Sequence, residues 1–314
     1  MGIKIFSGSS HPLFAAAVAK DLGVPVSAAT VLTFSNDNRL VSIDETVRGD
    51  DVYVIQTSTA PVDAHLMEGL MLLRALRDAS PARVTAVLPY FPYVRSDKKD
   101  VARICLTARL VADLYATAGA DHVVTMDLHS PQVQGFFSLP CDHLIAGPTI
   151  IKYLSSHWDL RDYVLVAGDA GAAKMLRIYS DALNLPVAIM NKRRDKNDEQ
   201  PYIKGVIGDV ANKNVLLIDD EVSSGRTLIR DAEFLIKEAG VKEVNACLVH
   251  AVLGGNAISE LNASPIHRFV ITNTIPSEQK DLRNKEVVDV APLFAETIRR
   301  IHGNQSIHSL NLVK

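Results

Sequence analysis

Cysteine is scarce in this sequence: only 3 cysteines occur among 314 residues, at positions 105, 141 and 247. Their number is odd and their spacing is wide, which fits neither a disulfide framework nor a zinc-binding cluster. We therefore expect reduced thiols that serve as small apolar side chains, as is usual in a cytoplasmic protein.

An excess of positive charge and long apolar runs are lacking as well. The formal net charge is −3 at pH 7, whereas binding to a phosphate backbone needs an excess of Lys and Arg. There is no apolar run of about 18 residues, the length that spans a membrane. The N-terminus carries one Lys and no apolar segment of the kind that signal peptides have. We therefore expect neither nucleic acid nor a membrane as a partner.

A P-loop is also missing, because Gly-x-x-x-x-Gly-Lys followed by Ser or Thr occurs nowhere in the chain. Any nucleoside triphosphate would have to be held by scattered Arg and Lys side chains together with magnesium.

The most informative stretch that is present begins at Asn214. Val215 to Ile218 is a continuous aliphatic run, which predicts a strand buried on both faces of a parallel sheet. Asp219 and Asp220 follow it directly, and ligands of open α/β sheets bind beyond the carboxyl ends of the strands. These carboxylates suit sugar hydroxyls or a metal ion, and not a phosphate.

A loop of small residues from Ser223 to Thr227 leads from the two acids into an amphipathic helix, which begins near Leu228 and is ended by Gly240. The free N–H groups and the positive dipole at the start of a helix attract an anion. The stretch therefore predicts a site for a phosphorylated sugar, with phosphate on the loop and hydroxyls on the carboxylates. The alternative is a strand end with solvated acids and an ordinary turn.

The length of 314 residues suits two domains. Both halves contain a helix ended by glycine, Gly119 or Gly240, then a strand and a histidine, His129 or His250. We interpret this as two similar α/β units in tandem. The predicted strands are 3–6, 52–56, 84–88, 123–126, 163–167, 186–190, 215–218, 244–249 and 269–272, and the predicted helices are 13–22, 63–77, 106–117, 228–239 and 289–302.

Several polar segments lie between these elements. Residues 89–100 combine aromatic and charged side chains, and 191–199 is polar without periodicity, so we expect two surface loops, the second one mobile. The tail 303–314 is polar, and we expect it to be poorly ordered. Ser7 to Ser10 precedes a helix and could bind an anion, and Asp169 lies between small residues at a strand end, a favourable place for a ligand.

A series of motifs covers nearly the whole chain. They are Phe6–Ser10, Val47–Tyr53, Phe91–Lys99, Ala118–His122, Asp127–Phe137, Lys192–Arg194, Gly208–Val210 and Asp219–Thr227. In this order they resemble the ribose-phosphate diphosphokinase family, the phosphoribosyl pyrophosphate synthetases. The resemblance implies an α/β fold of two tandem phosphoribosyltransferase-type domains with mostly parallel central sheets. Residues 1–150 would form the ATP side and residues 151–314 the ribose 5-phosphate side, with the last helix packing back on the first domain.

The resemblance also implies a reaction and its residues. MgATP would give its β,γ-diphosphoryl group to the C1 hydroxyl of ribose 5-phosphate, releasing AMP, in a homo-oligomer whose adenine pocket is shared between subunits. By position, ATP would contact Phe34, Asn36, Asp37, Asn38, Arg95 and Ser96; Mg²⁺ would bind His129 and Asp169; Lys192 and Arg194 would be catalytic; and ribose 5-phosphate would contact Arg194, Asp219, Asp220, Ser223, Ser224, Gly225, Arg226 and Thr227.

The chain departs from the family pattern at several positions. Asn38 and Ser96 stand where the common enzymes have Glu and Gln, which leaves the nucleotide detail open. Ser223 to Thr227 replaces a loop that usually carries a third acid. Val101 and Ala102 lack the ammonium and hydroxyl that phosphate-regulated relatives carry, so we expect a phosphate-independent variant.

Two other functions share parts of the pattern. A nucleobase phosphoribosyltransferase would have the loop from Asp219 to Thr227 but would not need the first half of the chain. A non-catalytic regulatory paralogue would have no need to retain Lys192, Arg194, His129 and Asp169, which this chain keeps.

Overall fold

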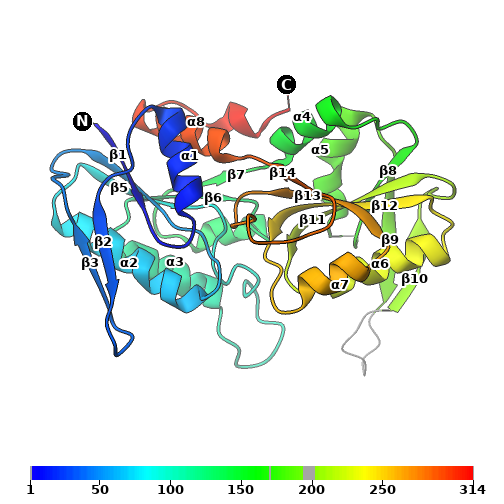
Figure 1. The fold of residues 1–314 in the computed structure, drawn as a ribbon, viewed down its shortest axis with the longest axis horizontal. Helices are drawn as coiled ribbons and strands as arrows, with labels where there is room; N and C mark the ends of the chain where they lie inside the picture. The colour runs from blue at the N-terminus through cyan, green and yellow to red at the C-terminus, as the bar shows by residue number, and fades with distance from the viewer. Residues whose placement is uncertain (1, 170, 194–201, 314) are drawn as a thin grey trace. The chain divides into compact units, whose positions relative to one another are not determined.

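A computed structural model describes residues 2–169, 171–193 and 202–313 of the chain (Figure 1). The chain folds into two compact units. Unit 1 comprises residues 1–146, 273–276 and 289–312, and unit 2 comprises 147–272, 277–288 and 313–314. The expected boundary at residue 150 lies inside helix α4 (Gly147–His157). The two units instead divide between residues 146 and 147, so that the whole helix belongs to unit 2.

The core of unit 1 is a five-stranded sheet in which all strands are parallel. In sheet order the strands are β1 (Ile3–Ser7), β4 (Asp51–Ile55), β5 (Arg83–Leu88), β6 (His122–Met126) and β7 (Cys141–Leu144). One face is covered by α1 (Pro12–Leu22) and α8 (Ala291–His302), and the other by α2 (Val62–Asp78) and α3 (Thr107–Ala118), as Figure 1 shows. Short 3₁₀ helices span Pro131–Phe136 (η1) and His308–Asn311 (η2).

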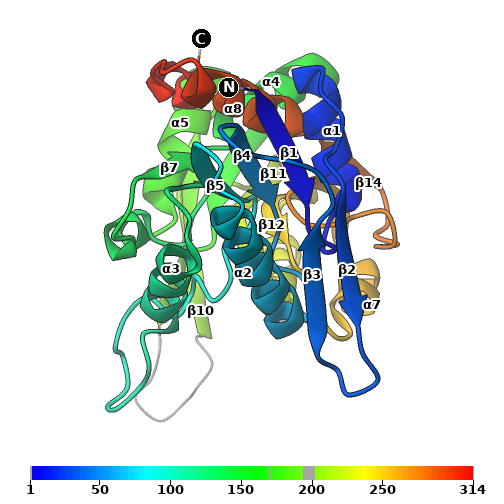
Figure 2. The ribbon, with the colours of Figure 1, turned by 90° about the vertical axis from the view of Figure 1, so that its left-hand side faces the viewer.

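Unit 1 also carries a separate antiparallel hairpin of β2 (Ala29–Thr33) and β3 (Arg39–Ile43), which the sequence did not predict. Figure 2 shows the hairpin as an arm with β3 beside α2. The guanidinium of Arg39 bridges to the buried Glu68 of α2 and donates to the Ala64 carbonyl at 3.1 Å. These contacts hold the turn end of the hairpin against the helix.

Unit 2 is built on a seven-stranded sheet. In sheet order the strands are β10 (Tyr202–Ile207), β9 (Val187–Arg193), β8 (Tyr163–Ala167), β11 (Asn214–Val222), β12 (Glu243–Ala251), β13 (Ile266–Thr272) and β14 (Lys285–Val288), and only β10 with β9 is antiparallel. In Figure 1, α4 and α5 (Ala173–Leu183) cover one face, and α6 (Arg226–Lys237) and α7 (Ala257–Ala263) cover the other.

The strand order of unit 2 reverses direction between β8 and β11. From β8 the chain crosses to β9 on one side, whereas from β11 it crosses to β12 on the other. Such a switch point opens a crevice at the carboxyl ends of the two strands, where α/β proteins bind ligands. The sheet of unit 1 has no such reversal among its described strands.

β11 is a strand because its first residues are aliphatic and fill both faces of the sheet. Val215 and Leu216 are fully buried, and Leu217 and Ile218 are 2% exposed. The sequence predicted that Asp219 and Asp220 directly follow the strand. In the structure the strand continues to Val222, so both residues lie within it. The main strands and helices predicted from the sequence are otherwise confirmed within a few residues.

Two polar segments differ from expectation. Asn191 to Arg193, expected in a loop, continue β9 and pair with β10, while residues 194–201 lie outside the described part. The tail is held in place, because the Asn311 side chain accepts from the Ile145 N–H at 3.0 Å and donates to the His143 carbonyl at 2.9 Å. Among the described residues, no helix combines the length and the apolar character that crossing a membrane requires.

Candidate functional site

The candidate site lies at the switch point of unit 2, at the carboxyl ends of β8 and β11. Backbone pairing between these strands ends at Ile218 and Ala167, whereas β11 remains paired with β12 as far as Val222. Asp219 therefore follows the last residue paired with β8, and Asp169 follows the end of β8. Two carboxylates thus occur where the two strands part.

A small pocket of about 70 Å³ opens at this point. It is lined by Gly168, Asp169, Ala172, Lys192, Leu217, Ile218, Asp219, Thr227, Leu228 and Asp231. Six of these residues were assigned from the sequence either to the site or to its strand: Asp169, Lys192, Leu217, Ile218, Asp219 and Thr227. The buried face of α6 contributes as well, through Leu228 and Asp231. The pocket joins elements that are distant in the sequence.

The loop from Ser223 to Thr227 turns the chain into α6. Gly225 has φ 75°, the left-handed region, and a Cβ there would lie 3.0 Å from the Leu261 side chain, so a larger residue would be strained and crowded. The helical ladder starts with the Ile229 N–H bonded to the Gly225 carbonyl at 2.9 Å. The N–H groups at the start of the helix precede this ladder, which is the usual environment for binding an anion.

The side chains of this loop face outward: Ser223, Ser224, Arg226 and Thr227 are exposed, and only Gly225 is buried. Hydroxyls, a guanidinium and helical N–H groups are all donors that suit a phosphate. The loop is anchored from behind, since the N–H of Gly254 donates to the Ser223 carbonyl at 3.0 Å. The sequence-based interpretation of this loop thus has a consistent local geometry.

Lys192, near the end of β9, does not point into solvent. Its ammonium lies 2.7 Å from Oδ2 of Asp231 on α6, and the two side chains are 12% and 2% exposed. Burial raises the pKa of Asp231 to about 6, an effect that the Lys192 ammonium partly offsets and the Asp169 charge increases. The Asp231 carboxyl is therefore mainly deprotonated above about pH 6.

Asp231 was missed by the sequence analysis, although a signal was available. The helix has an apolar stripe that includes Leu228, Ala232 and Leu235, all buried. Residue 231 lies on the same stripe, three positions after Leu228. An acid on the buried stripe of a helix needs a partner, and that partner comes from a strand distant in the sequence.

The two predicted magnesium ligands are exposed side chains at strand ends, one in each unit. In unit 2, Asp169 also accepts the Ala172 N–H at 2.9 Å, which organises the turn before α5. In unit 1, His129 follows a firmly held segment: Asp127 Oδ2 accepts the Ala146 N–H at 2.7 Å, and the Leu128 N–H donates to His143 Nε2 at 2.8 Å. The described residues contain no group of three or more His, Cys, Asp or Glu side chains suited to a metal.

The predicted ATP contacts of unit 1 occupy two places. Phe34, Asn36, Asp37 and Asn38 form the exposed turn of the β2–β3 hairpin, closed by the Phe34 N–H bonded to the Asn38 carbonyl at 2.8 Å. Arg95 is exposed on the loop after β5.

Ser96, another predicted ATP contact, forms hydrogen bonds within unit 1. Its hydroxyl donates to the Cys105 carbonyl at 3.1 Å and accepts the Thr107 N–H at 3.3 Å, while its carbonyl accepts the Ala108 N–H at 3.2 Å. The residue thus fastens the two ends of the charged loop to the start of α3.

The expectation that Ser7 to Ser10 could bind an anion is wrong in this structure. The Ser9 N–H and hydroxyl both donate to the buried Glu68, at 2.5 and 2.7 Å, and the Ser10 hydroxyl donates to Gln56 Oε1 at 2.5 Å. A Cβ at Gly8 would lie 2.2 Å from Gln56 Oε1, so the loop must come close to these side chains. A carboxylate already takes the donors that an anion would need.

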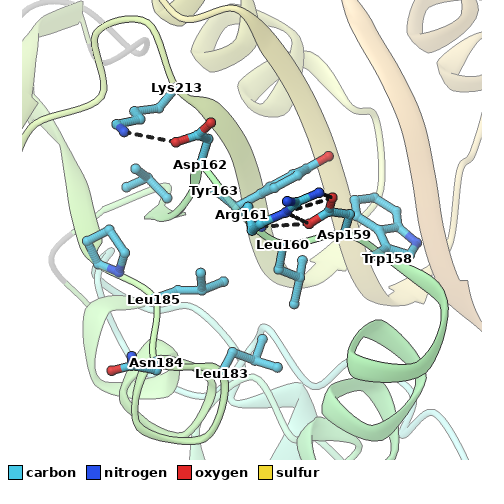
Figure 3. A pocket seen from close by; sticks show the side chains of 12 residues that line it. Trp158, Asp159, Leu160, Arg161, Asp162, Tyr163, Leu183, Asn184, Leu185 and Lys213 are labelled. Atoms are coloured by element: carbon cyan, nitrogen blue, oxygen red, sulfur yellow. Dashed lines mark hydrogen bonds and ion pairs between the residues drawn. The ribbon is translucent and has the colours of Figure 1, made fainter.

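A larger cavity of about 500 Å³ lies near the amino end of β8 (Figure 3). Its charged groups are paired with one another: Arg161 Nε lies 2.8 Å from Asp159 Oδ1, and Lys213 Nζ lies 3.3 Å from Asp162 Oδ1. Because ligands of α/β sheets bind at the carboxyl ends of strands, we place the functional site in the smaller pocket.

The predicted catalytic residue Arg194 lies outside the described residues.

The switch point, the acids of β11 and the glycine-led start of α6 define an α/β protein of the phosphoribosyltransferase type. Residues 3–119 match the N-terminal domain of ribose phosphate pyrophosphokinase, and residues 193–311 match the phosphoribosyl synthetase-associated domain. The chain belongs to the ribose-phosphate pyrophosphokinase family.

Individual relatives are similar to this chain over nearly its whole length. It is 45% identical over 309 residues to ribose-phosphate pyrophosphokinase of Caldanaerobacter subterraneus subsp. tengcongensis, covering 98% of this chain and 97% of that protein. It is 43% identical over 310 residues to ribose-phosphate pyrophosphokinase 4 of Saccharomyces cerevisiae, covering 98% and 94%. The crystal structure of phosphoribosylpyrophosphate synthetase from Mycobacterium smegmatis matches with a TM-score of 0.90 and 38% identity, covering 97% of this chain and 100% of that one.

Proposed function

We propose that this protein transfers the diphosphoryl group of MgATP to the C1 hydroxyl of ribose 5-phosphate, giving 5-phosphoribosyl 1-diphosphate and AMP. The observation that carries the proposal is the site at the switch point of unit 2, with Asp219 and Asp220 on β11 next to the start of α6. It occurs in a chain 45% identical to a ribose-phosphate pyrophosphokinase over nearly its full length.

Ribose 5-phosphate binds at the end of β11 in this proposal. Its 5-phosphate accepts hydrogen bonds from the first N–H groups of α6 and from Ser223, Ser224, Arg226 and Thr227, with Gly225 allowing the close approach. Asp219 and Asp220 accept hydrogen bonds from the ribose hydroxyls, which fixes the orientation of C1. The helix dipole and the loop donors thus face the negatively charged phosphate, and the carboxylate acceptors face the hydroxyls of the sugar.

Asp169 and His129 could supply only part of the coordination of a magnesium ion, and water and substrate phosphates would supply the remainder. Mg²⁺ prefers oxygen, retains water and is usually held by one or two carboxylates together with substrate phosphates. Asp169 offers such a carboxylate, and His129 offers an imidazole, a less usual ligand for this ion. When bound, the ion would neutralise charge on the triphosphate, and neither residue needs further protein ligands for that.

Arg95 and the hairpin turn would bind ATP. The turn is exposed on unit 1, and apolar side chains on the arm are exposed as well: Leu32 is 51%, Phe34 is 50% and Leu40 is 41% exposed. Exposed apolar groups on one arm are typical of a surface that another chain covers. We therefore propose a homo-oligomer in which the arm contributes Phe34, Asn36, Asp37 and Asn38 to the adenine pocket of a neighbouring subunit.

Lys192 and Arg194 would supply positive charge to the transferring diphosphoryl group. Such a transfer needs positioning and charge neutralisation more than covalent chemistry from the protein. Lys192 lines the pocket at the switch point, which is where the diphosphoryl group would meet the C1 hydroxyl in this proposal.

Two incubations separate this function from its rivals. Purified protein with Mg²⁺, ATP and ribose 5-phosphate should release AMP, and omission of the sugar phosphate should abolish the release. The same protein with phosphoribosyl diphosphate and a panel of nucleobases should release no diphosphate. Diphosphate release only in the second incubation would identify a nucleobase phosphoribosyltransferase, and activity in neither would identify a regulatory paralogue.

A further inference from the structure

The pairing of Lys192 with Asp231 is the feature of unit 2 that the proposed reaction does not by itself explain. Asp231 is 2% exposed and lies on the buried stripe of α6, and its Oδ2 takes the ammonium of Lys192 at 2.7 Å. Its other oxygen, Oδ1, is buried and has no hydrogen-bond partner among the described residues. Desolvating a carboxylate this far is unfavourable, so stability alone gives little reason for an acid here.

The pair lies directly beside the proposed reaction site. A Cβ added to Gly168 would lie 3.5 Å from Asp231 Oδ2 and 3.9 Å from Lys192 Nζ, so the pair is packed against the end of β8. Asp169 and Asp219 line the same pocket. The ammonium is therefore held on the surface where the diphosphoryl group would be transferred, and not on the outer side of β9.

We propose that Asp231 is a positioning residue for the diphosphoryl transfer, which holds the ammonium of Lys192 in the switch-point pocket before substrates bind. This inference rests on the proposed function, because it assigns a partner to the lysine that the function uses. Asp231 touches no substrate in this scheme and acts only through Lys192.

The physical reason is the freedom of a lysine side chain. An unpaired lysine samples many rotamers in solvent, and ordering it in each catalytic cycle opposes the transition state. A buried anion at a fixed place on a helix removes most of this freedom in advance, which is how supporting residues preorganise a site. Without the anion, the ammonium would be buried and unpaired, so it would move out of the pocket into water.

The kinetic test is Asp231→Asn, which keeps the size of the side chain and removes its charge. We expect kcat to fall by about tenfold or more with the KM for ribose 5-phosphate changed less than about twofold, because only the transition state loses a positioned cation. In a Lys192→Ala background, Asp231→Asn should change kcat by less than about twofold, since a positioning residue has nothing left to position. A wild-type or raised kcat in the single variant would overturn the proposal.

A matched control lies on the same helix. Glu233 pairs with Lys237 at 3.8 Å, and the side chains are 46% and 66% exposed, so Glu233→Gln also removes an acid from an ion pair on α6. It should leave kcat unchanged. Thermal unfolding of each variant shows whether it folds, and Asp231→Ala replaces Asp231→Asn if the latter does not.

A second readout is independent of catalysis. Limited acetylation of the unliganded protein with acetic anhydride, followed by peptide mass spectrometry, reports how accessible Lys192 is relative to the exposed Lys204 of β10. We expect Asp231→Asn to raise the relative acetylation of Lys192 by about fivefold or more, because the released ammonium enters solvent. Unchanged acetylation would contradict the pairing. If acetylation rises but the wild type forms no AMP, the pairing stands and the proposed function fails.

Discussion

Lys192 is the residue on which the proposed chemistry depends most. We predict that Lys192→Ala lowers kcat by about a hundredfold or more, the scale expected when one donor to a transition state is removed. Binding of ribose 5-phosphate should hardly change, because its proposed contacts lie on β11 and at the start of α6. Steady-state kinetics with isothermal titration of ribose 5-phosphate measure the two effects separately.

The control for this substitution is Lys204→Ala, which removes an exposed lysine from the neighbouring strand β10. It should retain full turnover. If Lys192→Ala also kept near wild-type turnover, Lys192 would have no catalytic role, and the role assigned to Asp231 would fall with it.

His129 and Asp169 are predicted to affect the metal and not the fold. Each is an exposed side chain beyond the end of a strand, so His129→Ala or Asp169→Ala removes little packing. We expect each variant to need several-fold more magnesium and ATP for half-maximal rate, with thermal unfolding within a few degrees of wild type. A drop of many degrees at unchanged magnesium dependence would show that the residue is structural.

The positions of single residues in the fold were predictable from the sequence where the signal was local. Asp219, Asp220 and Gly225 could be placed at the carboxyl end of β11 and the start of α6 because acids after an aliphatic run and a glycine before a helix form a contiguous pattern. Asp231 could not be assigned a partner, because Lys192 reaches it from a strand distant in the sequence. The anion site expected at Ser7 to Ser10 failed for the same reason, since Glu68 is supplied by α2.

At the scale of elements, α8 is tied to the sheet of unit 1 by a buried acid. Asp51 on β4 is fully buried and accepts hydrogen bonds from Arg83 at 2.8 and 2.5 Å and from Tyr53 at 2.8 Å, and it lies 2.8 Å from Nδ1 of His302 on α8. Arg83 also donates to the Ile301 carbonyl at 3.2 Å. This cluster fixes a helix that is distant in the sequence to the second strand of the sheet.

The pKa of Asp51 follows from this environment. Burial alone would raise it, but hydrogen bonds from Arg83, His302 and Tyr53 outweigh burial and lower it from 3.8. An acid whose pKa is lowered in the folded state stabilises that state above its unfolded pKa, and the contribution is lost as pH falls through the folded value.

We predict that Asp51→Asn destabilises unit 1 by roughly 2–4 kcal/mol at pH 7, because it leaves a partly buried guanidinium without its anion. The difference from wild type should shrink as the pH falls below 3.8, where the carboxyl of unfolded wild type takes up a proton, and should vanish below the lowered pKa of the folded carboxyl. Urea unfolding of both proteins at pH 7 and at pH 3 measures the change. A difference of equal size at both pH values would show that charge is not its cause.

Elements were predictable where apolar periodicity was strong. The buried strands and the helices that cover them were found from the sequence, since the spacing of their apolar residues reports burial. The hairpin β2–β3 was missed because its residues are half-buried or exposed and carry little apolar pattern. Asn191 to Arg193 were assigned to a loop because their side chains are polar and show no periodicity, whereas backbone pairing with β10 makes them a strand.

For the whole molecule, the central regulatory prediction is independence from inorganic phosphate. Val101 is 63% exposed, and the side chains of Val101 and Ala102 offer no donor at positions where the family resemblance implies an ammonium and a hydroxyl in phosphate-regulated relatives. Loss of two such donors weakens an anion site by roughly 2–6 kcal/mol. The hydroxyl of Ser309, in the C-terminal segment, already accepts from Arg300 at 2.7 Å.

Initial rates in a phosphate-free buffer should therefore change by less than about twofold when millimolar phosphate is added, and ADP should inhibit only by competing with ATP. Activation of tenfold or more by phosphate, or inhibition by ADP that saturating ATP does not relieve, would show that an anion site exists despite these residues.

The central claim is that two phosphoryl groups move together from ATP to the sugar. The most direct test follows the reaction of wild-type protein, MgATP and ribose 5-phosphate by ³¹P nuclear magnetic resonance. We predict that AMP and a sugar-linked diphosphate appear in equal amounts, with no transient ADP, and that Lys192→Ala slows both signals alike. Formation of ADP with a singly phosphorylated product, or no phosphoryl transfer at all, would contradict the account.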